Sequence, residues 1–344
     1  MTPERRPPLR IGLAGAGMIS HYHLIAWQRD SRAEVIALCD PDLARAQRRA
    51  AEFAIPAVYS DLDAMLAEHE LDAVDIASPR ETHAALVEAA AARGIDVLCQ
   101  KPLAPSFAAG EALAGRVAGK ARLMVHENWR FRPWYRSLKR WFDSGETGPL
   151  LQADMATLSS GLLPDATGRR PILERQPFMA KEERLMIAEV LIHHLDVLRW
   201  LFGPLRIVSA RTAHTLPDVR GETLAAIFLE TAAGAPVTLR GAMDAPGFPA
   251  GTGDRLEVVG SKASALFEGM ELRLLGVPGR QESFEFARDY QGSFDGAIRH
   301  FIECLISGAP FETDVRDNLE TLRLVEEAYA AAALAAAPGR SAPK

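Results

Sequence analysis

The stretch from Arg10 to Ser20, Arg-Ile-Gly-Leu-Ala-Gly-Ala-Gly-Met-Ile-Ser, limits what this chain can fold into more than any other. An apolar run breaks at Gly15 and Gly17, which predicts a strand that turns sharply into a helix. The spacing follows the G-x-G-x-x-G/A fingerprint of a dinucleotide-binding turn, with Ser20 in the third place. The first glycine permits the tight turn, the second lets the backbone approach a pyrophosphate, and the third position needs only a small side chain.

The helix expected after this turn begins near Met18, and its free N–H groups would hold the pyrophosphate. A glycine-rich turn without a ligand is the alternative for this motif alone. The next expected strand, Ala33–Asp40, favours the ligand, because Asp40 lies about twenty residues further on, where a carboxylate accepts the adenosine-ribose hydroxyls. That carboxylate repels a 2′-phosphate, so NAD is expected. NADP stays a less favoured alternative because of three arginines on the following helix, Arg45, Arg48 and Arg49.

Composition bounds the class of protein. The 344 residues suffice for two domains, and the net charge of −6 argues against nucleic acid as the main partner. Cys39, Cys99 and Cys304 are widely spaced, which suits reduced thiols in a cytoplasm. The N-terminus shows no secretory signal and no apolar run reaches the length of a membrane span, so a cytoplasmic protein without membrane contact is expected.

Residues 9–125 alternate strand and helix patterns, which predicts an α/β domain with a parallel, doubly wound sheet. The expected strands are Ile11–Ala14, Val35–Cys39, Val58–Tyr59, Ala73–Ala77, Ile95–Cys99 and Arg122–Val125. The expected helices are Ser20–Arg29, Leu43–Phe53, Leu62–Glu68, Thr82–Ala92 and Ser106–Ala118. Ligands bind such sheets at the carboxyl ends of the strands, which here carry Ser78-Pro79, Gln100-Lys101-Pro102 and His126-Glu127-Asn128.

Residues 126–312 follow a different pattern, which predicts an α+β domain for substrate binding and oligomerisation. A helix over Lys181–Phe202 ends in a Gly-Pro stop signal, and no crossover helix interrupts the strand-like runs that follow. This series predicts an open, mostly antiparallel sheet. Its expected strands are Leu205–Ala213, Thr223–Glu230, Pro236–Met243, Arg255–Gly260, Ser264–Phe267 and Glu271–Leu275. A helix over Phe294–Ser307 and a C-terminal helix within 313–338 close the fold.

Two groups of residues could carry chemistry. Lys101 follows a predicted strand, where a lysine beside a bound dinucleotide can hydrogen-bond a substrate hydroxyl, although a surface lysine is an equal alternative. On a helix, Glu189, His193 and Asp196 fall on one face, so a carboxylate on either side could orient the imidazole as a general base. His194 has no acid at matching spacing. A solvated polar stripe is the alternative, and no metal is expected, because a third ligand is not evident.

The segment Glu127–Trp134 joins the two domains. Asn128, Trp129 and Arg130, with Arg132, could line a cleft that holds a polar ring. The equal alternative is that the tryptophans pack at the domain interface while the arginines are solvated. A long irregular stretch, residues 159–177, is typical of a lid or an oligomer contact and carries Arg169, Arg170 and Arg175; an arginine in the cleft would favour an acidic substrate.

In combination these motifs resemble the Gfo/Idh/MocA family, the glucose–fructose oxidoreductase and inositol 2-dehydrogenase type of NAD(P)-dependent oxidoreductase. The resemblance covers Arg10 to about Ala333 and rests on motifs in a fixed order. They are the glycine turn with His23, Asp40, Ser78-Pro79 with His83, Lys101-Pro102, and the helix with Glu189, His193 and Asp196 before Trp200-Leu-Phe-Gly203.

The resemblance implies a Rossmann domain plus an α/β domain with an open sheet, a lysine from a Glu-Lys-Pro motif, and an Asp-x-x-x-His pair. Carried over, these are Lys101 and the Glu189/His193 pair, with His193 as acid/base. The glutamate before the lysine is Gln100 here, and the aspartate before the histidine is Glu189. The implied cofactor-binding residues are Gly15, Gly17, Met18, Ile19, Asp40, Ser78, Pro79, His83, Gln100 and Lys101; the implied substrate-binding residues are Asn128, Trp129, Arg130, His193 and Asp196.

The leading hypothesis is an NAD-dependent dehydrogenase that oxidises a secondary hydroxyl of a sugar, sugar derivative or cyclitol. One alternative is a family member that uses tightly bound NAD for sugar chemistry without net redox change. A second is a non-catalytic NAD-binding regulator, and a third is an enzyme that reduces an imine or pigment-like substrate. An exposed, apolar sheet face in the second domain predicts a homodimer or homotetramer.

Overall fold

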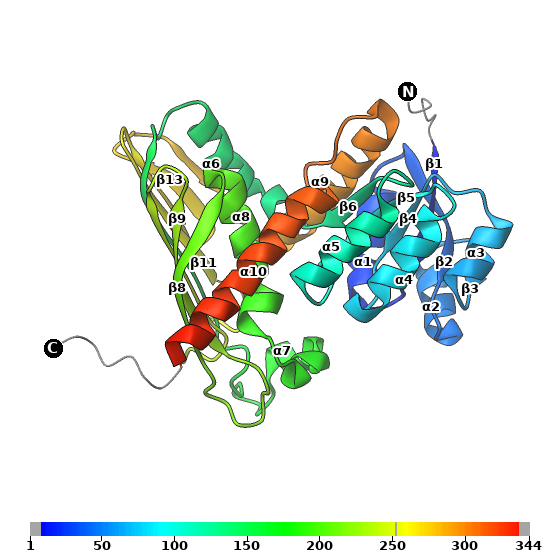
Figure 1. The fold of residues 1–344 in the computed structure, drawn as a ribbon, viewed down its shortest axis with the longest axis horizontal. Helices are drawn as coiled ribbons and strands as arrows, with labels where there is room; N and C mark the ends of the chain where they lie inside the picture. Colours follow the sequence, from blue (N-terminus) through cyan, green and yellow to red (C-terminus); the bar gives the residue numbers. More distant parts are fainter. Residues whose placement is uncertain (1–7, 252, 337–344) are drawn as a thin grey trace. The chain divides into compact units, whose positions relative to one another are not determined.

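A computed structural model of the chain describes residues 8–251 and 253–336, which form two compact units (Figure 1). One unit comprises the described part of residues 1–132 together with 287–322, and the other comprises 133–286 with the described part of 323–344. These units are defined by contacts within the chain and not by ligand binding. The boundaries expected between the cofactor-binding and substrate-binding domains, at 125/126 and 312/313, therefore stay a prediction.

The first unit is built on a six-stranded sheet in the order β3-β2-β1-β4-β5-β6 with every pair parallel, which confirms the doubly wound prediction. Its strands are β1 (Leu9–Ala14), β2 (Ala33–Cys39), β3 (Ala57–Tyr59), β4 (Ala73–Ile76), β5 (Asp96–Gln100) and β6 (Leu123–His126). Its helices are α1 (Met18–Gln28), α2 (Leu43–Phe53), α3 (Leu62–Glu68), α4 (Arg80–Ala91), α5 (Phe107–Val117) and the short η1 (Trp129–Phe131).

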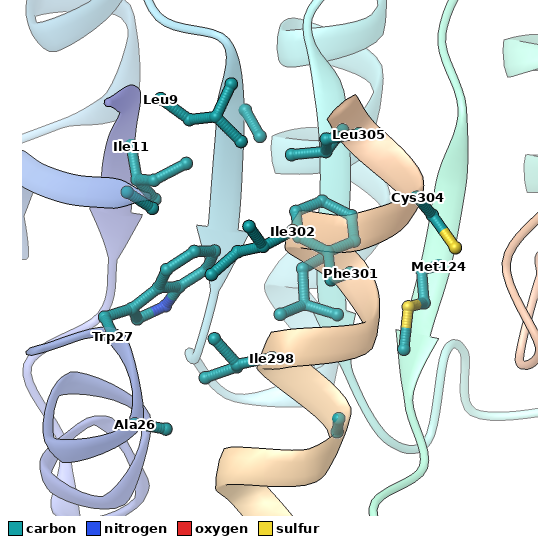
Figure 2. Close-up of a cluster of buried hydrophobic side chains, with 14 of the residues drawn as sticks. Leu9, Ile11, Ala26, Trp27, Met124, Ile298, Phe301, Ile302, Cys304 and Leu305 are labelled. Carbon is teal, nitrogen blue, oxygen red and sulfur yellow. The ribbon is translucent and has the colours of Figure 1, made fainter. Parts of the chain in front are cut away.

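A helix from late in the chain, α9 (Phe286–Ser307), completes the core of this unit. Figure 2 shows its apolar side chains beside Leu9, Ile11 and Trp27. Phe301 and Ile302 are fully buried in the same cluster. Only part of this helix was expected, from Phe294 onward, and its amphipathic pattern alone does not indicate which sheet it covers.

The second unit is built on an eight-stranded sheet in the order β14-β13-β12-β11-β7-β10-β9-β8. All its pairs are antiparallel except β7 with β10, so the expected mostly antiparallel sheet is confirmed. Its strands are β7 (Leu150–Leu158), β8 (Leu205–Ala213), β9 (Leu224–Thr231), β10 (Pro236–Ala242), β11 (Gly253–Gly260), β12 (Ser264–Glu268), β13 (Glu271–Leu275) and β14 (Gln281–Ser283). Sequence patterns missed the central strand β7, because its buried and accessible residues do not alternate cleanly.

The prediction of one continuous helix over Lys181–Phe202 is wrong. The structure has a 3₁₀ turn, η2 (Pro177–Lys181), then a π-helix, η3 (Met186–Leu191), and then α8 (Ile192–Phe202). The Glu222 carboxylate accepts the backbone N–H groups of Leu185 and Ile187 at 3.2 and 3.0 Å, which draws the first amides away from an α-helical pattern. Such a partner is 35 or more residues away in the chain, so no local signal reveals it.

Helices α6 (Pro133–Asp143) and α8 lie on one side of this sheet (Figure 1). A shallow depression elsewhere on the sheet is lined by residues that include Asp154, Arg211, Phe228, Arg240 and Arg255. The exposed face was expected to be apolar, and the lining combines charged side chains with apolar ones, of which Phe228 is a large exposed example. Self-association therefore stays a prediction. In the described ranges, no helix is long and apolar enough to cross a membrane.

Candidate cofactor and active sites

The glycine turn has the geometry that a pyrophosphate needs. Gly15 lies at φ +107°, and a Cβ added there would be 2.6 Å from the Ala77 carbonyl oxygen. Gly17 precedes α1 as its N-cap, no side chain caps that helix, and a Cβ added at Gly17 would have nothing within 4 Å. The Ser20 hydroxyl donates to the Gly17 carbonyl at 2.7 Å and is fully buried. The first amides of α1 thus combine with open space at Gly17, which fits a bound phosphate group.

Asp40 connects this turn to the end of β2. Its carboxylate accepts the backbone N–H of Ala16 at 2.8 Å, that of Asp42 at 2.8 Å and the Arg45 guanidinium at 2.7 Å. Burial raises the pKa of Asp40, but the hydrogen bonds from Arg45 and the two amides outweigh it and hold that pKa below its usual value. Asp42 caps α2, as expected, by accepting the Arg45 N–H at 3.0 Å. An ionised carboxylate therefore stands beside the glycine turn.

The arginines that made NADP an alternative cofactor are partly paired with acidic side chains. Arg45 pairs with Asp40, and Arg49 pairs with Glu52 at 2.6 Å while it also donates to the Gly17 carbonyl at 3.2 Å. The remaining expected cofactor residues here lie at the start of α1: Met18 is 38% exposed, and Ile19 packs against the apolar core.

A buried hydrogen-bond chain lies beneath the turn. His23 Nδ1 donates to Asp75 at 2.8 Å, and the Trp27 indole donates to the same carboxylate at 2.7 Å. The Gln100 amide nitrogen donates to His23 Nε2 at 3.1 Å, while the Gln100 carbonyl accepts the Lys101 backbone N–H at 2.6 Å. With these partners His23 donates from Nδ1 and accepts at Nε2. A neutral amide at position 100 suits that tautomer, because a glutamate would face the lone pair of Nε2.

His83 connects two loops at the carboxyl edge of the sheet. Its Nδ1 lies 3.0 Å from the Pro102 carbonyl and its Nε2 lies 3.0 Å from the Ser78 carbonyl. Burial lowers the pKa of His83 although these carbonyls oppose the shift. The loops after β4 and β5, which carry Ser78-Pro79 and Lys101, are thereby held to one another.

Glu127 is a buried acid that the sequence placed at a strand end without assigning it a role. Gln100 and His126 are register partners on β5 and β6, so Lys101 and Glu127 are the next residues at the ends of adjacent parallel strands. The Glu127 side chain is fully buried, and burial raises its pKa to about 7 against the opposing charges of Lys101, Arg130 and Arg132. Its position at a strand end was visible in the sequence, but its burial was not.

Replacing Glu127 by glutamine is expected to stabilise the protein at pH 8. The folded-state pKa of about 7 lies above the usual 4.5, so the folded state binds more protons between these values and loses stability as pH rises through them. The difference corresponds to about 3 kcal/mol of unfolding free energy. Urea unfolding of wild type and Glu127→Gln should therefore differ by about this amount at pH 8 and little at pH 5. An equal difference at both pH values would contradict the assignment.

The segment after Glu127 is buried. Asn128 donates to the Ser293 hydroxyl at 2.8 Å, and Arg130 donates to Asp317 at 2.8 Å. Arg132 lies flat against the Trp129 ring, with its guanidinium carbon 3.4 Å from the ring centroid. The alternative with solvated arginines is wrong, because Arg130 and Arg132 are each only 1% exposed. Trp129 is also buried.

The second unit carries the candidate general base. His193 lies in the first turn of α8 and is 8% exposed. Asp196 is fully buried, and its carboxylate lies 3.6 Å from the Arg199 guanidinium. Glu189 is 7% exposed and lies on the π-helix η3. The α-helical period therefore relates His193 to Asp196 but not Glu189 to His193, since a π-helix has a wider turn. The orienting role of Glu189 stays a prediction.

The neighbouring His194 is occupied by a structural network. It is fully buried, its Nε2 lies 3.0 Å from Asp254, and its Nδ1 lies 3.2 Å from the Val190 carbonyl. Asp254 also accepts the Tyr135 hydroxyl at 2.8 Å. These contacts tie α8 to β11 and α6. Sequence spacing found no acid for His194, because its partner is 60 residues away.

The irregular stretch over 159–177 contains a short helix, α7 (Pro171–Arg175). Arg170 pairs with Asp218, and Arg169 donates to the Thr167 hydroxyl at 2.8 Å. A lid role for this stretch stays a prediction. Among the described residues, no group of three or more His, Cys, Asp or Glu side chains is placed to hold a metal ion.

Several curated proteins are similar to this chain over most of its length. A D-apiose dehydrogenase from Paraburkholderia graminis is 32% identical and the match covers 93% of this chain and 86% of that protein. A D-apiose dehydrogenase from Rhizobium rhizogenes is 31% identical, covering 94% and 95%. Inositol 2-dehydrogenase 4 from Saccharopolyspora erythraea is 31% identical, covering 87% and 86%.

A solved oxidoreductase from Agrobacterium radiobacter, in complex with NAD⁺, L-tartaric acid and magnesium, superposes with a TM-score of 0.87 at 28% identity, over 95% of this chain and 96% of that one. Residues 9–128 match the model of the oxidoreductase family with an NAD-binding Rossmann fold, and residues 135–266 match the GFO/IDH/MocA C-terminal domain. The glycine turn and Asp40 thus belong to an NAD-binding oxidoreductase, and the chain is a member of the Gfo/Idh/MocA family.

Proposed function

We propose that this protein is an NAD-dependent dehydrogenase that oxidises a secondary hydroxyl of a sugar, sugar derivative or cyclitol. The observation that carries the proposal is the near full-length similarity to dehydrogenases named for D-apiose and for inositol, together with the presence of Lys101 and His193. Both named compounds are polyols, so a hydroxyl-bearing carbon is the reacting group.

In this proposal His193 takes the proton of the reacting hydroxyl, and Glu189 orients its imidazole. Lys101 donates a hydrogen bond to the hydroxyl oxygen and stabilises the negative charge that develops there. Bound NAD supplies the hydride acceptor. We assign the remaining cofactor contacts to Gly15, Gly17, Met18, Ile19, Asp40, Ser78, Pro79, His83 and Gln100, and the substrate contacts to Asn128, Trp129, Arg130 and Asp196.

The proposal is tested with purified protein, NAD and a panel that contains D-apiose, several aldoses, inositols and tartrate. We expect saturable NADH formation, followed by absorbance, with at least one neutral polyol. The absence of turnover in both directions across the panel would contradict it. NAD that co-purifies and does not exchange would favour sugar chemistry without net redox change. Exchangeable NAD without turnover would favour a regulator.

Replacing Asp40 by serine is expected to shift the cofactor preference toward NADP. The change removes the carboxylate that repels a 2′-phosphate and releases Arg45 to face it. The ratio of the NADP to the NAD dissociation constant should fall about 10- to 100-fold, or about 1.4–2.8 kcal/mol. Isothermal titration with both cofactors measures the ratio, and Asp40→Ser with Arg45→Ala is the matched control. An unchanged ratio would show that Asp40 does not select the cofactor.

A further inference from the structure

The ends of β5 and β6 present a lysine and an acid side by side. Because Gln100 and His126 are the last register pair of these parallel strands, Lys101 and Glu127 are the residues that directly follow them. Their opposite charges attract each other across this edge of the sheet. Glu127 is fully buried, and Lys101 is partly accessible, as suits a carboxylate behind a cation that faces a ligand.

Two other cations contribute to the field around Glu127, but each has a strong partner of its own. The Arg130 guanidinium donates to the Asp317 carboxylate at 2.8 Å and to the Glu312 carbonyl at 3.1 Å. The Arg132 guanidinium stacks on the Trp129 ring. Because Glu127 lies next to Lys101 at this edge of the sheet, we take Lys101 as the cation that its carboxylate positions.

Gln100 cannot provide a negative charge beside Lys101. Its side-chain carbonyl accepts the Lys101 backbone N–H, and its amide nitrogen donates to His23. Both ends of this neutral side chain are therefore engaged, one with the loop backbone and the other with the His23 ring. The charge that faces the Lys101 ammonium has to come from another element, and β6 supplies it.

We propose that Glu127 is a positioning residue for Lys101: its carboxylate, at the end of β6, directs the Lys101 ammonium toward the substrate. This inference rests on the proposed function, in which Lys101 donates to the reacting oxygen. A lysine carries a compact charge on a flexible stem, so a fixed carboxylate behind it limits the orientations of the ammonium. Without that carboxylate the Lys101 side chain remains, but its ammonium is no longer directed toward the substrate.

Several ionisable groups face Glu127. Lys101 approaches from the end of β5, Arg130 lies in η1 and Arg132 directly follows it. His126 precedes it on β6, and the His126 ring contacts the His23 ring of α1 in a tilted arrangement with centroids 4.1 Å apart. A pH profile of the reaction therefore contains contributions from more than one group. The decisive test compares variants at a single pH.

Two substitutions at Glu127 separate charge from shape. Glu127→Gln keeps the size and removes the charge, whereas Glu127→Asp keeps the charge and shortens the side chain. If the charge positions Lys101, kcat for the polyol that turns over best falls about 10- to 100-fold in Glu127→Gln and stays within about threefold in Glu127→Asp. The KM for NAD stays near the wild-type value in both. The reverse order, with the glutamine variant active and the aspartate variant impaired, would overturn the proposal.

A second readout needs no turnover. Lys101 is labelled with limiting acetic anhydride at pH 7.5 without NAD, and its acetylation is measured by mass spectrometry relative to Lys262, an exposed lysine of the other unit. Without the facing carboxylate the Lys101 ammonium is no longer held in one orientation, so its labelling rate rises about tenfold in Glu127→Gln. Unchanged labelling together with unchanged kcat would refute the role of Glu127. If wild type oxidises no polyol, the proposed function fails, and the labelling still decides this inference.

Discussion

Replacing His193 by asparagine is expected to lower kcat for polyol oxidation about 10²- to 10⁴-fold, the usual contribution of a positioned general base. Asparagine keeps a polar side chain of moderate size but cannot accept a proton at neutral pH. The dissociation constant for NAD should stay within about twofold, because the cofactor residues belong to the glycine turn and the strand ends of the other unit. Steady-state kinetics and cofactor titration measure the two quantities separately.

The adjacent histidine provides the matched control. His194 is bonded to Asp254 and to the Val190 carbonyl, so His194→Asn removes a buried structural contact. This variant should unfold at a lower urea concentration while its remaining folded fraction keeps kcat within about threefold of wild type. If His194→Asn loses turnover and His193→Asn does not, the roles that we assign to the two residues are exchanged.

Replacing Gly15 by alanine is expected to damage both the fold and cofactor binding. The residue lies at φ +107°, which disfavours any side chain, and the new Cβ would lie 2.6 Å from the Ala77 carbonyl oxygen. Neighbouring strands supply both sides of this contact, so relief requires the backbone to move. We expect a loss of about 2–4 kcal/mol in the free energy of unfolding, measured in urea. A stability equal to wild type would show that the turn can relax.

Gly17→Ala is the informative companion. A Cβ at this position has nothing within 4 Å, and the backbone lies at φ −70°, which alanine adopts without strain. Stability should therefore remain within about 1 kcal/mol of wild type. The dissociation constant for NAD should nevertheless rise about 10-fold or more, because the methyl group occupies the space through which the pyrophosphate approaches the α1 amides. Unchanged affinity would mean that the phosphate does not approach Gly17.

The elements that the sequence predicted best are those with complete local signals. Helices α2 and α3 begin and end at the expected residues, since Asp42 and Asp61 cap them by accepting the amides of Arg45 and Ala64. Strand β8 also has the expected bounds. By contrast, β7 lies at the centre of its sheet, and its pattern is indistinct because partners on both edges decide its burial.

The residues of the candidate site show the same difference between local signals and distant partners. The glycine turn, Asp40 and Lys101 were readable because each depends on a short motif at a strand end. The partners that define other residues come from distant positions: Asp254 for His194, Glu222 for the π-helix, and the sheet of the first unit for α9. No periodicity encodes such a partner.

The sequence by itself determined the order of strands and helices from β1 to β6, the dinucleotide turn and the types of residue available for proton transfer, because propensity, capping and spacing act within a few residues. Only the tertiary structure decided that Glu127 is buried beside a lysine, that Gln100 is hydrogen-bonded to His23, and that Glu189 lies on a π-helix. The physical reason is that burial and hydrogen-bond partnership depend on which distant segments exclude water from a side chain.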